Sequence, residues 1–167
     1  MNAALILEVV NPLLIRRVCE LAEEIWREHY TPIIGREQVD YMLEKFQSEQ
    51  SVAAQIQAGC LYYLVKNDQN DVGYFCVQPK RASNELFLSK FYIRAPARGR
   101  GYGRIAQDFI EQLARQKGLG KIMLTVNKHN ENSIKIYQKM GFEITEAIVQ
   151  DIGSVFFMDD YRMEKCC

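Results

Sequence analysis

The stretch FYIRAPARGRGYGR, residues 91–104, combines the end of a strand, a glycine-rich turn and the start of a helix. Glycines at 99, 101 and 103 leave the backbone N–H groups of the turn uncovered, because glycine has no Cβ. The helix that follows brings the positive end of its dipole to the same turn. The stretch therefore predicts a binding site for an anion, and a pyrophosphate fits that description.

Three arginines, Arg98, Arg100 and Arg104, alternate with these glycines. The chain as a whole is neutral, with 21 basic and 21 acidic residues, so this positive charge is a local feature. A balanced chain has no general attraction to nucleic acid or to an anionic membrane. The alternative interpretation is a solvated basic turn in which the glycines only set the backbone geometry.

Two other phosphate-binding motifs fit this turn less well. A Walker loop requires G-x-x-x-x-G-K-[ST], which the chain lacks. Residues 101–106 satisfy the dinucleotide pattern G-x-G-x-x-A, but that site needs an acidic residue at the end of the next strand to bind ribose. The next expected strand is followed by Asn127 instead. A dinucleotide-binding oxidoreductase is therefore the weaker alternative.

Periodicity and turn residues on either side of this stretch predict a mixed α+β fold. The length of 167 residues fits one domain, 1–167. The expected strands are 5–10, 61–66, 72–77, 85–93, 121–126, 142–149 and 156–165. The expected helices are 12–30, 36–46, 48–58, 101–117 and 130–140. Residues 31–35 are expected to break the first helix at Pro32, and residues 151–154 to form the turn of the last hairpin.

Composition excludes several classes of protein. No stretch approaches the ~18 uninterrupted apolar residues of a membrane span, and the start lacks the basic leader of a signal peptide. The five cysteines are scattered or adjacent, without a C-x-x-C pair, and the two histidines lie far apart. Reduced thiols in a cytoplasmic protein without a metal site are the expectation.

Two motifs carry a family resemblance. Arg98-x-x-Gly101-x-Gly103 after an apolar strand resembles the coenzyme A motif of the GNAT acetyltransferase superfamily. Residues 126–137, VNKHNENSIKIY, followed by QKMGF, resemble the second signature of that family. The resemblance covers residues 60–165 well. The ending 156–165 is further similar to the bacterial polyamine acetyltransferases of the PaiA type.

The resemblance implies a fold and a reaction. The fold is a single domain with a central, mixed but mostly antiparallel sheet of about seven strands. Helices cover both faces of the sheet, and a splayed parallel pair of strands forms the coenzyme site. The reaction is transfer of the acetyl group of acetyl-CoA to an amino group of a small acceptor, with a polyamine as one option. Dimers are common for this fold.

The resemblance also assigns site residues. The coenzyme is expected to contact Phe91, Tyr92, Ile93, Arg98, Gly99, Arg100, Gly101, Tyr102, Gly103, Arg104, Asn130, Ser133 and Tyr137. Asn130 can equally be an ordinary helix N-cap. Tyr137, whose phenol has a reference pKa of ~10, suits a general acid for the departing thiolate, and its alternative role is packing on the sheet.

The general base is left unassigned. Many relatives carry a glutamate four residues before Phe91, where this chain has Phe87. Glu85 can act through water, or be an exposed charge at the start of a strand. The acidic and aromatic candidates for contact with the acceptor are Glu23, Glu24, Glu28, Tyr30, Asp151, Asp159 and Asp160. A non-catalytic acetyl-CoA sensor is a further alternative, and a cysteine-nucleophile acyltransferase lacks a suitable Cys–His pair.

Overall fold

The computed structural model describes residues 4–167 and divides into two compact units. The first unit contains the described residues up to Gln78 together with Lys90–Ile110, and the second contains Pro79–Ser89 and Glu111–Cys167. Within the described chain seven strands form one sheet in the order β1-β2-β3-β4-β5-β7-β6. The pair β4–β5 is parallel, whereas β1–β2, β2–β3, β5–β7 and β6–β7 are antiparallel. The expected seven-stranded, mostly antiparallel sheet is confirmed.

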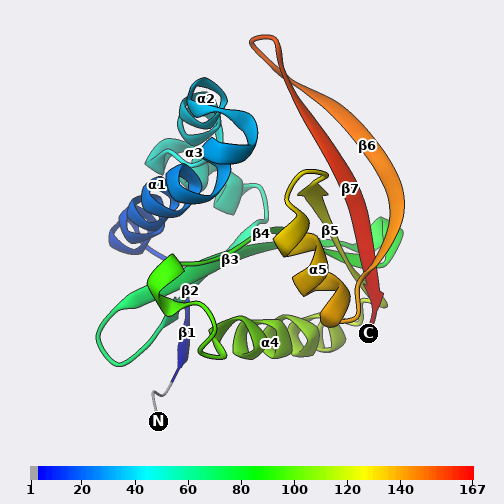
Figure 1. Cartoon of the computed structure of the whole chain (residues 1–167). Helices are drawn as coiled ribbons and strands as arrows, with labels where there is room; N and C mark the ends of the chain where they lie inside the picture. Colours follow the sequence, from blue (N-terminus) through cyan, green and yellow to red (C-terminus); the bar gives the residue numbers. More distant parts are fainter. Residues whose placement is uncertain (1–3) are drawn as a thin grey trace. The chain divides into compact units, whose positions relative to one another are not determined.

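The first unit contains three helices near its N-terminal end, α1, α2 and α3 (Figure 1). Asn11 caps α1 by accepting a hydrogen bond from the N–H of Leu14 at 3.0 Å, and Ser48 caps α3 in the same way through Ser51. The elements of this unit are β1 (Leu5–Glu8), α1 (Pro12–Ile34), α2 (Arg36–Phe46), α3 (Glu49–Gln57), β2 (Leu61–Lys66) and most of β3 (Asp71–Lys80).

The first helix is longer than predicted, because Pro32 lies inside α1 instead of ending it at Tyr30. A proline this close to the C-terminal end removes one hydrogen bond without preventing the last turn. The helix ends where Gly35, with φ 87°, donates its N–H to the carbonyl of Thr31 at 3.0 Å. Glycine adopts this positive φ without steric cost, so it is Gly35 that ends the helix.

Side chains of β2 and β3 alternate between two helical layers of the first unit. Tyr74 accepts a hydrogen bond from Trp26 of α1 at 2.9 Å, so this face of the strands meets α1. On the opposite face Tyr63 stacks on Phe75, and both rings contact Phe109 of α4 (Tyr102–Gln116). Helices therefore cover both faces of the sheet in this unit, as expected.

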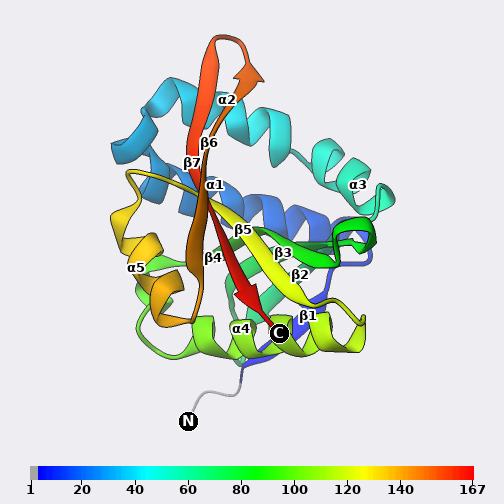
Figure 2. The ribbon, with the colours of Figure 1, turned by 90° about the vertical axis from the view of Figure 1, so that its right-hand side faces the viewer.

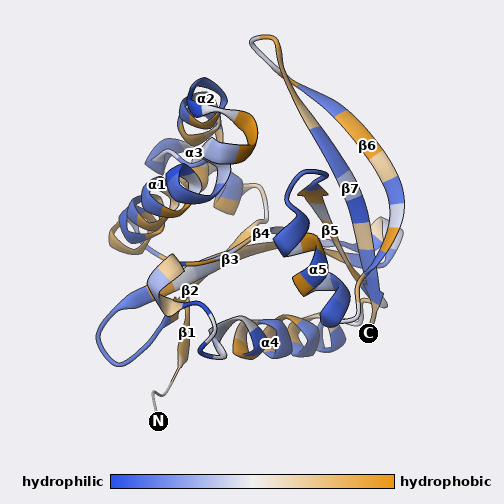
Figure 3. Cartoon of the chain, viewed as in Figure 1, coloured by the Kyte–Doolittle hydropathy of each residue, from blue (hydrophilic) through white to orange (hydrophobic). Residues whose placement is uncertain are grey.

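The second unit is built on β5, β7 and β6, which lie side by side in that order (Figure 2). Its elements are the start of β4 (Glu85–Ile93), the end of α4, β5 (Lys121–Asn127), α5 (Glu131–Lys139), β6 (Glu143–Gly153) and β7 (Phe156–Cys166). Hydrophobic residues recur along α4, as the amphipathic pattern predicts (Figure 3). The parallel ladder pairs Glu85–Leu88 with Lys121–Leu124.

Several strand ends differ from the prediction. The last hairpin turns at Ser154 and Val155, with φ 51° and 62°, instead of at residues 151–154. Two successive residues with positive φ make a tight two-residue turn, so β6 continues to Gly153. Similarly, β3 continues to Lys80, three residues beyond the expected end, and β1 ends at Glu8 instead of Val10. No helix in residues 4–167 has the length and apolar character needed to span a membrane.

At Gly73 the backbone of β3 lies close to the end of β4. A Cβ at this position would lie 2.3 Å from the carbonyl oxygen of Tyr92 and 2.7 Å from Cδ1 of Ile93. We expect Gly73→Ala to lower the free energy of unfolding by about 2–3 kcal/mol, because backbone atoms must shift. Gln69→Ala, which shortens an exposed side chain in the turn before β3, is the control. Urea denaturation curves measure both, and equal losses would contradict the close contact.

Candidate functional site

The glycine-rich turn of the first unit connects β4 to α4. A short 3₁₀ turn, Ala95–Ala97, follows β4, and the chain then takes positive φ values at Gly99 (76°) and Gly101 (90°). Helix α4 begins at Tyr102, and the N–H of Ile105 donates to the carbonyl of Gly101 at 3.1 Å. A Cβ at Gly99 or Gly101 would meet no atom within 4 Å, so the space beside this backbone is open. The turn therefore has the local geometry of an anion site at a helix N-terminus.

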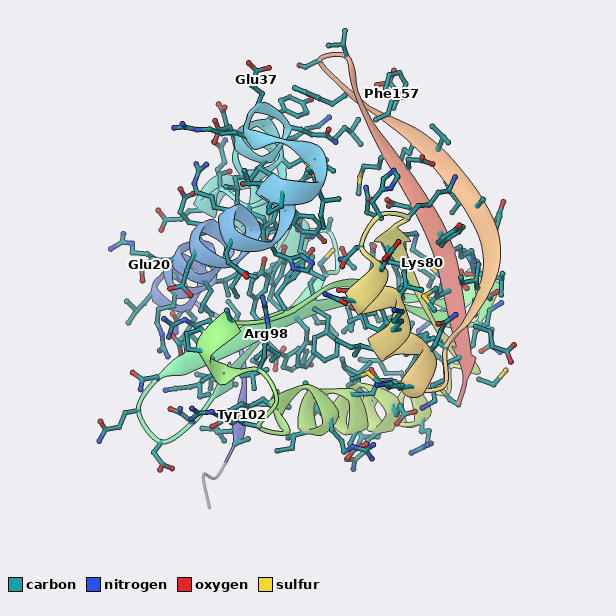
Figure 4. The ribbon with its side chains drawn as sticks, viewed as in Figure 1. Glu20, Glu37, Lys80, Arg98, Tyr102 and Phe157 are labelled. Atoms are coloured by element: carbon teal, nitrogen blue, oxygen red, sulfur yellow. The ribbon has the colours of Figure 1, made fainter. Side chains whose placement is uncertain are left out.

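Arg98 fastens this turn to α1. Its Nε donates to the carbonyl of Ile93 at 2.9 Å, and its two terminal nitrogens lie 3.3 and 3.1 Å from the carboxylate of Glu28. Figure 4 labels Arg98 and Tyr102 on either side of the turn. Arg94 forms a second two-point contact with Glu24, at 2.6 and 3.0 Å. Glu24 and Glu28 are one helical turn apart, so both pairs hold the turn against the same face of α1.

Arg100 and Arg104 differ from Arg98. Both are exposed, and neither forms an ion pair or a hydrogen bond with any residue in the described chain. Their charges are available to a ligand, whereas the guanidinium of Arg98 is held by the protein itself. The three arginines of the motif therefore have two different local environments.

Two polar side chains of α4 are buried without a partner. The hydroxyl of Tyr102 and both amide atoms of Gln107 make no hydrogen bond within residues 4–167, although each residue is only 3% exposed. Buried polar groups nearly always have a protein or water partner. These two groups therefore call for a partner outside the chain. Gln107 was not among the predicted site residues, and its place in an otherwise apolar helix face was the signal for it.

The end of β4 is fixed by aromatic contacts. The hydroxyls of Tyr92 and Tyr30 share a hydrogen bond of 2.9 Å, and the Tyr92 ring lies 5.6 Å from Trp26 and 5.5 Å from Tyr74. The ring of Phe91 lies 6.2 Å from that of Phe75. Side chains of neighbouring β4 residues thus anchor the strand, which gives its backbone a defined position.

Lys90 is a polar group of β4 that the sequence did not single out. Its ammonium donates to Oε1 of Gln55 at 3.3 Å and lies 5.6 Å from the centre of the Tyr62 ring. Burial lowers the pKa of Lys90, against the opposing effect of the thiols of Cys76 and Cys60. The signal for Lys90 in the sequence was its spacing: it lies two residues before Tyr92, and residues two apart on a strand point to the same face.

The predicted residues of the second unit lie on and beside α5. Asn130 is 4% exposed, and its side chain accepts a hydrogen bond from the N–H of Ser133 at 3.4 Å, which confirms its role as N-cap. The ring of Tyr137 meets that of Phe142 edge-on, with centres 5.7 Å apart. Gly141, with φ 97°, ends this helix. The coenzyme contacts and the acid role of these residues stay predictions.

Glu85 is not the exposed charge that the sequence allowed. It is 5% exposed and lies in a network of ion pairs on the sheet. Its Oε2 lies 2.6 Å from Arg162 and 3.8 Å from Lys121, and Oε1 accepts from the Ser83 hydroxyl at 3.0 Å. Since burying a carboxylate requires such partners, Glu85 serves the structure of the second unit.

The seven candidates for contact with the acceptor differ in whether they have a partner within the described chain. Six of the seven are engaged: Glu23 with Arg27, Glu24 with Arg94, Glu28 with Arg98, Tyr30 with Tyr92, Asp151 with the N–H of Gly153, and Asp159 with Lys128. Asp160 is the exception. It is 6% exposed and makes no hydrogen bond or ion pair with the residues that the structure describes.

The surroundings of Asp160 shift its ionisation. Burial raises the pKa of its carboxyl from 3.8 to about 6, the charge of Asp159 adds to the increase, and Lys128 opposes it. A carboxyl with this pKa is ionised at neutral pH at a cost to folding. Groups with such perturbed ionisation concentrate at functional sites. In residues 4–167, no cluster of three or more His, Cys, Asp or Glu side chains could hold a metal ion.

The raised pKa of Asp160 predicts a pH dependence of stability. The folded state binds this proton more tightly than the unfolded state, so stability falls as pH rises from about 4 to about 7. Over that range we expect wild type to lose about 2–3 kcal/mol relative to Asp160→Asn, which has no proton to bind. Urea denaturation at several pH values measures the difference. A constant difference across the range would refute the raised pKa.

Comparison with known proteins places these features in a family. The acetyltransferase (GNAT) family model matches residues 16–142. Two relatives from Bacillus subtilis are described as uncharacterized N-acetyltransferases. YycN is 32% identical over 53% of this chain and 58% of its own length, and YdgE is 30% identical over 50% of this chain and 55% of its own length. The matched part therefore spans little more than half the length of these relatives.

The fold is also found among solved structures. The PaiA N-acetyltransferase of Thermoplasma acidophilum, solved in complex with coenzyme A, aligns with a TM-score of 0.80. The alignment covers 99% of each chain at 19% sequence identity. At this identity the likeness concerns the fold.

Proposed function

Because this chain belongs to the acetyltransferase (GNAT) family, we propose that it transfers the acetyl group of acetyl-CoA to a primary amino group of a small acceptor. The observation that carries this proposal is the open backbone turn at Gly99 and Gly101, at the start of α4. Beside it are the cations of Arg100 and Arg104, which form no ion pair within residues 4–167. Backbone N–H groups and guanidinium groups are the donors that a diphosphate requires.

The residues of the first unit fit a coenzyme of this chemistry. In the proposal the backbone of residues 99–103 binds the pyrophosphate, and Arg100 and Arg104 neutralise its charge. The side chain of Arg98 positions the turn through Glu28 and Ile93. The unpartnered hydroxyl of Tyr102 and amide of Gln107 suit a ligand that carries phosphate and amide groups. The PaiA structure of Thermoplasma acidophilum, with the same fold, holds coenzyme A.

The proposed chemistry needs few groups. The neutral amine attacks the thioester carbon, so that a C–N bond forms and the C–S bond breaks. The amine loses one proton to solvent, the coenzyme thiolate gains one from the phenol of Tyr137, and the resulting phenolate regains one from water. A phenol with a reference pKa of ~10 is protonated at neutral pH and can donate to a thiolate. Backbone N–H groups near Phe91 and Tyr92 are the proposed donors to the carbonyl oxygen.

The proposed acceptor class is that of small cationic amines, polyamines included. Resemblance of residues 156–165 to the PaiA-type enzymes supports it, as does the surplus of carboxylates on β7. A cytoplasmic setting is also proposed, because the described cysteines are free thiols, which a reducing compartment preserves.

Gly101→Val tests the phosphate turn. A side chain at this position covers the backbone that the pyrophosphate is proposed to approach, so the Kd for acetyl-CoA should rise about 10- to 100-fold. Gly118→Val is the matched control, since Gly118 also has a positive φ (69°) and open space around its Cα but lies after the end of α4. Titration calorimetry measures both affinities. Equal effects of the two substitutions would argue against this site.

Tyr137→Phe tests the general acid. Loss of the proton donor should lower kcat about 10²-fold or more, with little change in the Kd for acetyl-CoA. Tyr161→Phe on β7 is the control. Thiol release from acetyl-CoA in the presence of a panel of amines measures turnover. Unchanged turnover would remove Tyr137 from the mechanism, and tight binding without any thiol release would favour a non-catalytic sensor.

A further inference from the structure

One face of β7 carries three charged side chains at alternate positions, Asp160, Arg162 and Glu164. Two of them are fully paired. Arg162 contacts Glu85 at 2.6 Å and Glu164 at 3.4 Å, and Lys121 contacts Glu164 at 2.6 Å. Two cations therefore serve two carboxylates in this part of the second unit, which is the balance expected of buried charges.

Asp160 lies on the same face of β7 but forms no ion pair with a residue of the described chain. The β5–β7 register pairs Thr125 with Arg162 and Asn127 with Asp160, so both β7 side chains point to the same face of the sheet. On the β6 side the partner of Asp160 is the apolar Ile148. The strand neighbours of Asp160 thus include no group that could balance its charge.

Lys128, whose charge acts on Asp160, is already engaged. The ammonium of Lys128 lies 2.7 Å from the carboxylate of Asp159 and 5.7 Å from the centre of the Tyr161 ring. Asp159 and Tyr161 lie on the opposite face of β7 from Asp160, because successive strand residues alternate. The ammonium of Lys128 is therefore paired with Asp159 on one face, whereas Asp160 on the other face is 6% exposed and has no hydrogen bond or ion pair in the described chain.

A cationic ligand would complete this arrangement. Asp160 belongs to no group of three or more His, Cys, Asp or Glu side chains that could hold a metal ion within residues 4–167. A metal ion is therefore a poor fit, whereas a compact alkylammonium group needs a single carboxylate to form a charge-assisted hydrogen bond. We propose that Asp160 binds a protonated amino group of the acceptor, distinct from the neutral amino group that is acetylated. This assignment rests on the proposed function and specifies which carboxylate selects a cationic amine.

Spermidine, as a probe with several protonated amino groups, tests the assignment by direct binding. The full chain is saturated with coenzyme A and titrated with spermidine in a calorimeter, for wild type and Asp160→Asn. Removing one charge-assisted hydrogen bond should weaken spermidine binding about 10- to 100-fold. The affinity for coenzyme A should be unchanged. Glu146→Gln, which removes an exposed carboxylate from β6 of the same hairpin, should bind spermidine like wild type.

These experiments separate a failure of the Asp160 assignment from a failure of the proposed acetyl transfer. Equal affinity of wild type and Asp160→Asn for spermidine, equal losses in Asp160→Asn and Glu146→Gln, or no binding to wild type would each overturn the assignment. A protein that binds spermidine through Asp160 but releases no thiol from acetyl-CoA would uphold the binding site and refute the proposed reaction. Thermal melting of each variant confirms that it is folded. In the same proteins, steady-state kinetics should show the change in the KM for spermidine and not in that for acetyl-CoA.

Discussion

An open backbone turn is the constraint on which the proposed chemistry depends. Uncovered N–H groups can bind an anion only if the turn is held in one conformation, since a mobile turn would lose most of the binding energy to ordering. The structure meets this requirement with two guanidinium–carboxylate contacts, Arg94–Glu24 and Arg98–Glu28, and with the hydrogen bond from Arg98 to the carbonyl of Ile93. Arginine suits this task because its planar fork forms two parallel hydrogen bonds.

Pairing of carboxylates with cations also stabilises the second unit. Buried carboxylates such as Glu85 are stable only with closely placed cations, and Arg162 and Lys121 provide them. Asp160 departs from this rule, and its raised pKa is the physical consequence. A group that lowers stability at neutral pH and has no partner in the described chain is well suited to a ligand, because binding supplies the missing interaction.

Local patterns allowed most of the fold to be predicted. Periodicity located the strands and helices because each buries one face, and capping residues such as Asn11 and Asn130 marked where helices begin. The errors lie at element ends. Pro32 predicts a helix break but lies in the last turn of α1. The pattern also places the final hairpin turn too early, because Val155 is not a typical turn residue. Element ends depend on a few local hydrogen bonds, which propensity represents poorly.

By itself the sequence determined the glycine-rich turn, its positive charge and the two family signatures, because each of these is a property of neighbouring residues. Only the tertiary structure decided how the charged side chains are used. Arg98 and Glu28 are 70 residues apart in the chain, so nothing local reveals that this arginine positions the turn. In the same way, only strand register, burial and the pairing of Lys128 with Asp159 distinguish Asp160 from the six other acceptor candidates. Which charged residues pair across many residues of sequence is set by tertiary packing, and no local sequence pattern predicts it.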